Sequence, residues 1–225
     1  MKQRLILLFL IVASLGFTLN QEKLPEGFNY IKDVIPTVKV ELRYYGAHNF
    51  MGVPVDGYNS EAAILSSDAV AALKKVQKEL LKSNLSVKIF DAYRPQQAVN
   101  HFVRWAKVFN DTIKKKEFYP KVKKQDLFKE GYISSKSGHS RGSTIDMTLV
   151  DVITGKELDM GSPWDFFGPE SWVANLNLNV QQRANRMLLQ NIMSKHGFKY
   201  YTKEWWHFTL KNEPFPDTYF DFPIN

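Results

Sequence analysis

The sequence contains no cysteine, and this absence excludes several chemistries at once. Without thiols there is no disulfide framework, no thiolate nucleophile and no sulfur-ligated zinc or iron–sulfur site. Five histidines are then the only side chains that offer nitrogen ligands. Any metal in this protein must therefore be bound by histidine and carboxylate groups.

The chain also lacks a strong charge imbalance. Its 225 residues carry a formal net charge of +7, and 44% of them are hydrophobic, including 16 Phe and 10 Tyr. This composition excludes a purely solvating or disordered protein and is sufficient for one sizeable core. We expect a single globular domain.

Long apolar runs are absent beyond the N-terminus, so no membrane span is expected in the rest of the chain. Lys2 and Arg4 precede an apolar run over residues 5–17, after which the sequence becomes polar. This order is typical of a secretory signal and predicts a signal peptide at residues 1–20, with the folded domain at residues 21–225. The protein is then exported, either periplasmic or secreted. A retained N-terminal anchor and a cytoplasmic protein with a buried N-terminus are the alternatives.

Residues 114–130 contain seven lysines but only three acidic side chains. Nucleic-acid binding requires such charge to be interleaved with stacking aromatic residues, and these are few here. We interpret the segment as a solvated surface excursion and expect no nucleic-acid partner. Contact with another anionic polymer is the alternative.

Hydrophobic periodicity and turn signals predict a mixed set of elements. Strands are expected at residues 34–45 (interrupted by Pro36), 87–90, 144–150 and 205–210, and helices at 67–80, 95–109 and 180–196. The strand at 144–150 alternates polar and apolar residues, which predicts that one of its faces is buried. No βαβ regularity is visible. We expect an α+β fold, in which helices flank a central antiparallel sheet.

A polar, Gly-containing loop that leads into a strand carries the first candidate site residues. His139 lies in this loop and Asp146 lies on the polar side of the strand, with Gly138 and Gly142 between or beside them. A loop that folds back through the glycines brings both side chains together, and both are suitable metal ligands. A capping aspartate and a surface histidine would give the same pattern.

The stretch Glu204-Trp205-Trp206-His207-Phe208 places an acid and a histidine among bulky aromatic residues. Together with His139 and Asp146, His207 completes a three-ligand zinc set with one open position, and Glu204 can act as general base. Strand parity puts Glu204 and His207 on opposite faces, so this hypothesis requires a bend or bulge near Trp205. The alternative is an aromatic core strand with a hydrogen-bonded histidine.

The third cluster, Asp91 to Pro95, falls where a strand ends and a helix begins. Arg94 would be held on rigid elements there, and its guanidinium is suited to stabilise a developing oxyanion while Asp91 orients it. An ordinary surface ion pair is the alternative and would contribute little.

These residues resemble the zinc D-alanyl-D-alanine dipeptidases, part of a wider group of D-Ala-D-Ala carboxypeptidase-like and hedgehog-like metallopeptidases. The group's patterns Ser-x-His-x-x-Gly-x-x-x-Asp and Glu-x-x-His are met by Ser137, His139, Gly142 and Asp146, and by Glu204 and His207. The dipeptidase branch is indicated by further segments in the same order, namely residues 44–50, 54–58, 91–95, 165–170 and 204–207. Several spaced motifs in order are more specific than any one of them.

The resemblance implies a hedgehog-like fold and assigns roles to individual residues. His139, Asp146 and His207 look like the ligands of one zinc per chain, Glu204 like the catalytic base and Arg94 like the transition-state stabiliser. Ser137, Tyr44 and Asp165 fall where such dipeptidases hold the termini of a small substrate. The implied reaction is hydrolysis of D-Ala-D-Ala in a pocket that excludes longer peptides.

The resemblance and the signal peptide together suggest a bacterial enzyme that turns over or scavenges D-Ala-D-Ala released from the cell wall. A D,D- or L,D-carboxypeptidase or endopeptidase of the same group is the nearest alternative and would need an open groove. A non-catalytic wall-peptide-binding module is an alternative of another class.

Overall fold

The structure is a computed structural model that describes residues 24–225. The predicted signal peptide at residues 1–20 lies outside the described residues. No helix within residues 24–225 combines the length and the apolar character that crossing a bilayer requires.

A five-stranded sheet forms the centre of the fold, with the strand order β2-β4-β5-β7-β6. Its strands are β2 (Lys39–Val40), β4 (Leu85–Asp91), β5 (Thr144–Asp151), β6 (Phe198–Tyr201) and β7 (Glu204–Leu210). All neighbours in this sheet are antiparallel except β2 and β4. A second, two-stranded sheet pairs β1 (Phe28–Tyr30) with β3 (Ile64–Ser66).

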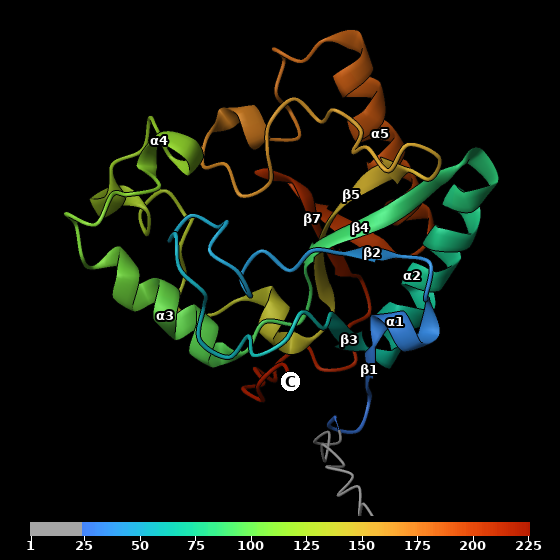
Figure 1. Cartoon of the computed structure of the whole chain (residues 1–225), viewed down its shortest axis with the longest axis horizontal. Helices are drawn as coiled ribbons and strands as arrows, with labels where there is room; N and C mark the ends of the chain where they lie inside the picture. Colours follow the sequence, from blue (N-terminus) through green and yellow to red (C-terminus); the bar gives the residue numbers. More distant parts are fainter. Residues whose placement is uncertain (1–23) are drawn as a thin grey trace, which may run out of the picture.

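Helices flank the central sheet, as Figure 1 shows: α2 and α5 lie on one side of it, and α3 and α4 on the other. The α-helices are α1 (Ile31–Val34), α2 (Ser67–Leu80), α3 (Gln96–Ala106), α4 (Lys115–Phe118) and α5 (Val180–Lys195). Short 3-10 helices are η1 (Leu81–Ser83), η2 (Lys124–Asp126), η3 (Gly138–Arg141) and η4 (Pro169–Ser171). The arrangement confirms the α+β fold.

Local sequence signals explain the two long helices. In α2 the residues Val70, Leu73, Val76 and Leu80 recur at helical spacing, and all four are buried in the core. Helix α5 begins with a capping box, in which Asn179 and Gln182 bond each other's backbone N–H groups. It ends before Gly197, whose φ of +93° suits a residue without a side chain.

Two expectations about strands are wrong. Residues 34–45 do not form one strand, because Val34 ends α1 and only Lys39–Val40 pairs in the sheet. The strand β5 is buried on both faces rather than one, because Thr144, Asp146 and Thr148 are at most 2% exposed. Part of this cover comes from the loop that carries Trp164, whose indole nitrogen donates to Asp146.

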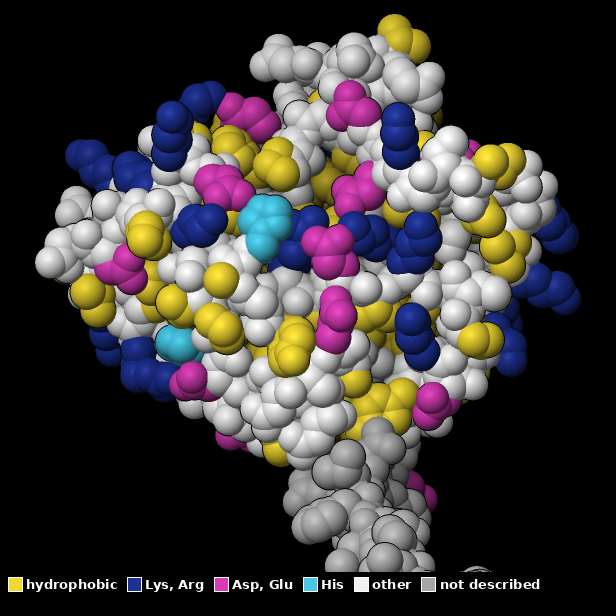
Figure 2. Space-filling view, in the orientation of Figure 1, with side chains coloured by type: hydrophobic (Ala, Val, Ile, Leu, Met, Phe, Trp, Pro, Cys, Tyr) yellow, Lys and Arg dark blue, Asp and Glu magenta, His cyan; other side chains and the backbone are white. Residues whose placement is uncertain are grey.

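The lysine-rich segment of residues 114–130 folds back onto the protein. Lys114 and Lys121 pair with Glu117 and Glu170, while Lys115 and Lys124 donate to backbone carbonyl oxygens. Figure 2 shows acidic side chains interspersed with the basic ones on this face of the molecule. The segment is therefore a packed part of the domain.

Candidate active site with a metal centre

Three neighbouring strands bring polar side chains into one row across the central sheet. Asp91 on β4 lies opposite Asp146 on β5, and Asp146 lies opposite His207 on β7. The pairing of β4 with β5 shifts register between Ile89 and Asp91. This irregularity turns Asp91 to the side of Asp146, whereas Ile89 stays on the core side with Met147.

His139 approaches the same row from the turn η3, just before β5. Ser137 caps this turn by accepting a hydrogen bond from the backbone N–H of His139 at 3.3 Å. The ring nitrogen Nδ1 of His139 lies 2.7 Å from the carbonyl oxygen of Ala92, which can only accept. Nδ1 is therefore the donor, and Nε2 keeps its lone pair toward Asp146 and His207.

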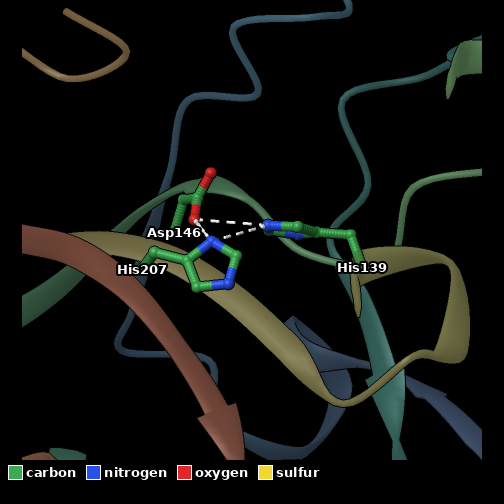
Figure 3. Close-up of side chains that lie close together, drawn as sticks. All are labelled: His139, Asp146 and His207. Carbon is green, nitrogen blue, oxygen red and sulfur yellow. Dashed lines mark hydrogen bonds and ion pairs between the residues drawn. The ribbon is translucent and has the colours of Figure 1, made fainter. Parts of the chain in front are cut away.

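Side chains of His139, Asp146 and His207 point toward one another, as Figure 3 shows. Nε2 of His139 and Nδ1 of His207 lie 3.3 Å apart, and Oδ1 of Asp146 lies 3.3 Å and 3.1 Å from them. Ligands bound to tetrahedral zinc at about 2.0–2.1 Å are separated by roughly 3.3 Å. This buried Oδ1 atom also accepts no hydrogen bond from any described residue. The three atoms therefore fit a zinc site.

The charges of the site favour a cation at this point. Burial would raise the pKa of Asp146, but the facing rings of His139 and His207 outweigh it and hold that pKa well below its usual range. Burial would likewise lower the pKa of His207, but the facing carboxylates of Asp146 and Glu204 raise it to about 9. The carboxylates of Asp146 and Glu204 thus stabilise positive charge at this site.

Glu204 lies beside this centre because β7 is irregular where it pairs with β6. Tyr200 pairs with Phe208, but the next residue, Tyr201, pairs with Glu204. The bulge expected near Trp205 is therefore present, and it places Oε2 of Glu204 3.4 Å from Nδ1 of His207. The Glu204 side chain is 22% exposed, so solvent reaches it.

Arg94 lies in the turn between β4 and α3, three residues after the strand ends, and is oriented by Asp91. Nε and Nη2 of Arg94 lie 2.9 Å and 2.8 Å from Oδ2 of Asp91, which is fully buried. The other Asp91 oxygen accepts a hydrogen bond from the Tyr58 hydroxyl at 2.6 Å. The guanidinium also lies over the ring of Tyr44, 5.0 Å from its centroid. Because this ion pair is buried and doubly bonded, it is not the surface pair considered as an alternative.

The residues assigned to substrate termini line the same pocket. Ser137, Tyr44 and Asp165 surround it together with Arg94 and Glu204, and its volume is about 210 Å³. That volume is below the ~300–1,000 Å³ of sites for drug-sized ligands, so it suits a smaller molecule. The Tyr44 hydroxyl donates to Asp165 at 2.6 Å. Burial raises the pKa of Asp165 well above its usual value, although the bond from Tyr44 acts against this.

Two further residues of the site have no role in the sequence patterns. Trp164 donates to Oδ2 of Asp146 at 3.3 Å and so occupies the oxygen that faces away from the histidines. Tyr58 holds Asp91 from a loop far from it in sequence. Tyr58 lies within a segment that carries the resemblance, but nothing in its neighbours indicates a partner, and Trp164 is signalled only by its position next to Asp165.

A candidate metal site of two histidines and a carboxylate, with a second carboxylate and a guanidinium in the same small pocket, is typical of metal-dependent hydrolases. The chain belongs to the D-ala-D-ala dipeptidase family, whose sequence model matches residues 25–225. It is accordingly a metallopeptidase.

Individual relatives agree with this assignment over most of the chain. The D-alanyl-D-alanine dipeptidase of Enterococcus faecium is 36% identical over 198 residues, which cover 88% of this chain and 98% of that protein. The D-alanyl-D-alanine dipeptidase of Streptomyces coelicolor is 38% identical, with the same two shares of 88% and 98%. Among solved structures, the LdcB LD-carboxypeptidase aligns with a TM-score of 0.42 at 16% identity, over 86% of this chain and 72% of that one.

Proposed function

We propose that this protein is a zinc-dependent dipeptidase that hydrolyses D-Ala-D-Ala to two molecules of D-alanine. One zinc per chain would be held by His139, Asp146 and His207. The observation that carries the proposal is the convergence of these three ligand atoms with Glu204 and Arg94 in a single small pocket.

The reaction requires water to attack the peptide carbonyl carbon and a proton to reach the leaving amine. Bound zinc supplies Lewis-acid polarisation of the carbonyl and of the attacking water. Glu204 takes the proton of the water and gives it to the amine nitrogen as the C–N bond breaks. Arg94, held by Asp91, offsets the negative charge that develops on the carbonyl oxygen.

Selection of a dipeptide follows from how the pocket would hold the two ends of the substrate. The buried carboxyl of Asp165 suits the free ammonium, and Ser137 and Tyr44 offer hydroxyl groups to the termini. A longer peptide would replace a charged terminus by an amide and leave these buried groups unpaired.

The predictions about location and polymer partners remain part of the proposal. Residues 1–20 would direct export and residues 21–225 would form the catalytic domain, so the enzyme would act on D-Ala-D-Ala released from the cell wall. N-terminal sequencing of the mature protein tests this, and an N-terminus at Met1 would contradict it. Nucleic acid is not a proposed partner, because at least four lysines of the 114–130 segment bond within the protein.

Catalysis is tested by offering the purified zinc protein D-Ala-D-Ala, L-Ala-L-Ala and a muropeptide in parallel. We expect cleavage of D-Ala-D-Ala, and a loss of kcat of at least about 100-fold in Glu204→Gln, which removes the proton acceptor. Glu61→Gln, at an exposed position, is the matched control. Cleavage of the muropeptide alone would instead favour a carboxypeptidase or endopeptidase, and peptide binding without turnover would favour a binding module.

The metal assignment is tested by elemental analysis. We expect about one zinc per chain in the wild-type protein and loss of that zinc in His139→Ala, because two remaining ligands bind the ion too weakly. His48→Ala alters an exposed histidine away from the centre and should keep the metal. A His139→Ala protein that retains its zinc would contradict the proposed ligand set.

A further inference from the structure

Residues 213–225, here called the C-terminal strap, run along the side of the molecule marked C in Figure 1. Apart from an isolated bridge at Ile224, the strap contains no regular secondary structure. None of its residues lines the pocket. It nevertheless contacts three of the turns and loops that carry or support site residues: the His139 turn, the Arg94 turn and the Tyr58 loop.

At the His139 turn the strap makes a two-point ion pair and a backbone bond. Nε and Nη2 of Arg141 donate to the two carboxylate oxygens of Glu213 at 2.8 Å and 2.7 Å. The two side chains are only 17% and 7% exposed. The backbone N–H of Phe220 donates to the carbonyl oxygen of Ser140 at 2.8 Å. The residues held in this way follow His139 directly in η3.

At the Arg94 turn the strap contacts Tyr93 and Gln96, the residues just before and just after Arg94-Pro95. The Tyr93 hydroxyl donates to the carbonyl oxygen of Phe222 at 3.0 Å, and the two rings stack with centroids 4.1 Å apart. The backbone N–H of Gln96 donates to the carbonyl oxygen of Phe220 at 3.0 Å. Tyr93 itself is fully buried.

At the Tyr58 loop the strap adds a short parallel bridge. Ile224 pairs with Tyr58, and its N–H donates to the carbonyl oxygen of Gly57 at 2.8 Å. The carbonyl oxygen of Ile224 accepts from the N–H groups of Asn59 and Ser60. Tyr58 is the residue whose hydroxyl bonds Asp91, so this contact also reaches the support of Arg94.

We propose that the C-terminal strap is the positioning element of the active site, with Glu213 orienting the metal-ligand turn and Phe222 orienting the Arg94 turn. The inference rests on the proposed function, because it assigns the strap to the geometry of that same site. Groups that orient a metal ligand from outside affect metal affinity or activity about 10–100-fold when they are removed. A strap that serves stability alone would leave zinc affinity and kcat unchanged in the folded protein.

The contact at the His139 turn is tested with Glu213→Gln, which keeps the side-chain shape but removes the charge that pairs with Arg141. We expect the zinc dissociation constant, measured by chelator competition on folded protein without substrate, to rise about tenfold. Asp217→Asn makes the same charge change at an exposed strap position and should leave zinc affinity unchanged. Equal zinc affinity in the two variants, or an equal loss in both, overturns this part of the inference.

The contact at the Arg94 turn is tested with Tyr93→Phe, which removes one hydrogen bond to the strap without changing charge. This variant also tests the positioning role of the strap if Glu213→Gln does not fold. We expect a fall of about threefold to tenfold in kcat with KM and zinc affinity unchanged, because Arg94 acts on the transition state. A wild-type kcat in Tyr93→Phe overturns this part. A wild-type protein that binds zinc but does not cleave D-Ala-D-Ala would contradict the proposed substrate while leaving the zinc measurement valid.

Discussion

Asp165 illustrates how a single buried residue is suited to its role at the cost of stability. It adopts a φ of +61°, which an aspartate tolerates better than most side chains, and it is 7% exposed. Its side-chain hydrogen-bonding partner is the neutral hydroxyl of Tyr44, and no cationic side chain within residues 24–225 bonds it. The charged form of Asp165 therefore lacks a bonded counter-charge, which an ammonium group of the substrate would provide.

The raised pKa of Asp165 makes a prediction about stability and pH. The folded protein holds this proton more tightly than the unfolded chain does, so the stability from the carboxyl is complete below about pH 4 and is lost as the pH rises toward the folded-state pKa. Asp165→Asn should therefore be more stable than the wild type at neutral pH, with a difference that grows by up to about 1.4 kcal/mol per pH unit in that window. Urea unfolding at several pH values measures it.

Asp217→Asn makes the same substitution at an exposed position and is the control for removing a carboxylate. An Asp165→Asn protein that is less stable than the wild type at pH 7 would contradict the assignment of a buried carboxyl without a counter-charge.

At the scale of elements, irregular strands decide which residues meet. Regular alternation along β7 would separate Glu204 from His207, and regular pairing of β4 would keep Asp91 on the core side with Ile89. Bulges in these two strands reverse both outcomes. A bulge near Trp205 is expected from the sequence only because the proposed roles of Glu204 and His207 require both side chains on the same side of the strand. Nothing in the sequence indicates the bulge after Ile89.

The lysine-rich segment shows that a run of charged residues can pack against a helix instead of lying in solvent. Lys124 is 4% exposed, and its Nζ atom lies 3.7 Å from the centroid of the Trp105 ring and 2.6 Å from the carbonyl oxygen of Asp111. This lysine joins the segment to α3. In a solvated excursion it would have been exposed.

Replacing Lys124 should therefore affect stability more than replacing its neighbours. We expect Lys124→Ala to lower the free energy of unfolding by about 1–2 kcal/mol, because it removes a buried cation–π contact and a hydrogen bond. Lys129→Ala, at an exposed position of the same segment, should change it by less than about 0.5 kcal/mol. Denaturant unfolding compares the two, and equal effects would contradict the structural role of Lys124.

At the scale of the whole molecule, the proposed zinc site joins distant parts of the chain. His139 comes from a turn, Asp146 from β5 and His207 from β7, and the two histidines are 68 positions apart in the sequence. A ligand that binds the folded state alone stabilises it by an amount that rises with the logarithm of the ligand concentration over its dissociation constant. Zinc should therefore stabilise the entire domain and not only the site.

Removal of zinc by a chelator should lower the thermal midpoint by about 5–10 °C, which corresponds to ~2.7 kcal/mol at 100 times the dissociation constant. Differential scanning calorimetry with and without chelator measures this difference. His139→Ala should unfold at the same temperature in both conditions. A wild-type midpoint that does not respond to the chelator would mean that no stabilising metal is bound.

The available chemistry and most of the regular elements follow from the amino-acid sequence alone. The absence of cysteine restricts metal ligands to histidine and carboxylate groups, and helical periodicity locates α2 because it records which face of the helix is buried. Gly197, after Lys195 and His196, marks the end of α5. The motifs that carry the family resemblance also single out the residues of the pocket. These features are local, so they can be read along the chain.

The contacts between groups that are distant in sequence depend instead on how the whole chain packs. The link from Tyr58 to Asp91, the bond from Trp164 to Asp146 and the ion pair of Arg141 with Glu213 join residues 33, 18 and 72 positions apart. The contacts that bury the second face of β5 likewise come from residues outside that strand. Loops and bulges produce these contacts, and their paths depend on the packing of the whole domain, which no local pattern of residues encodes.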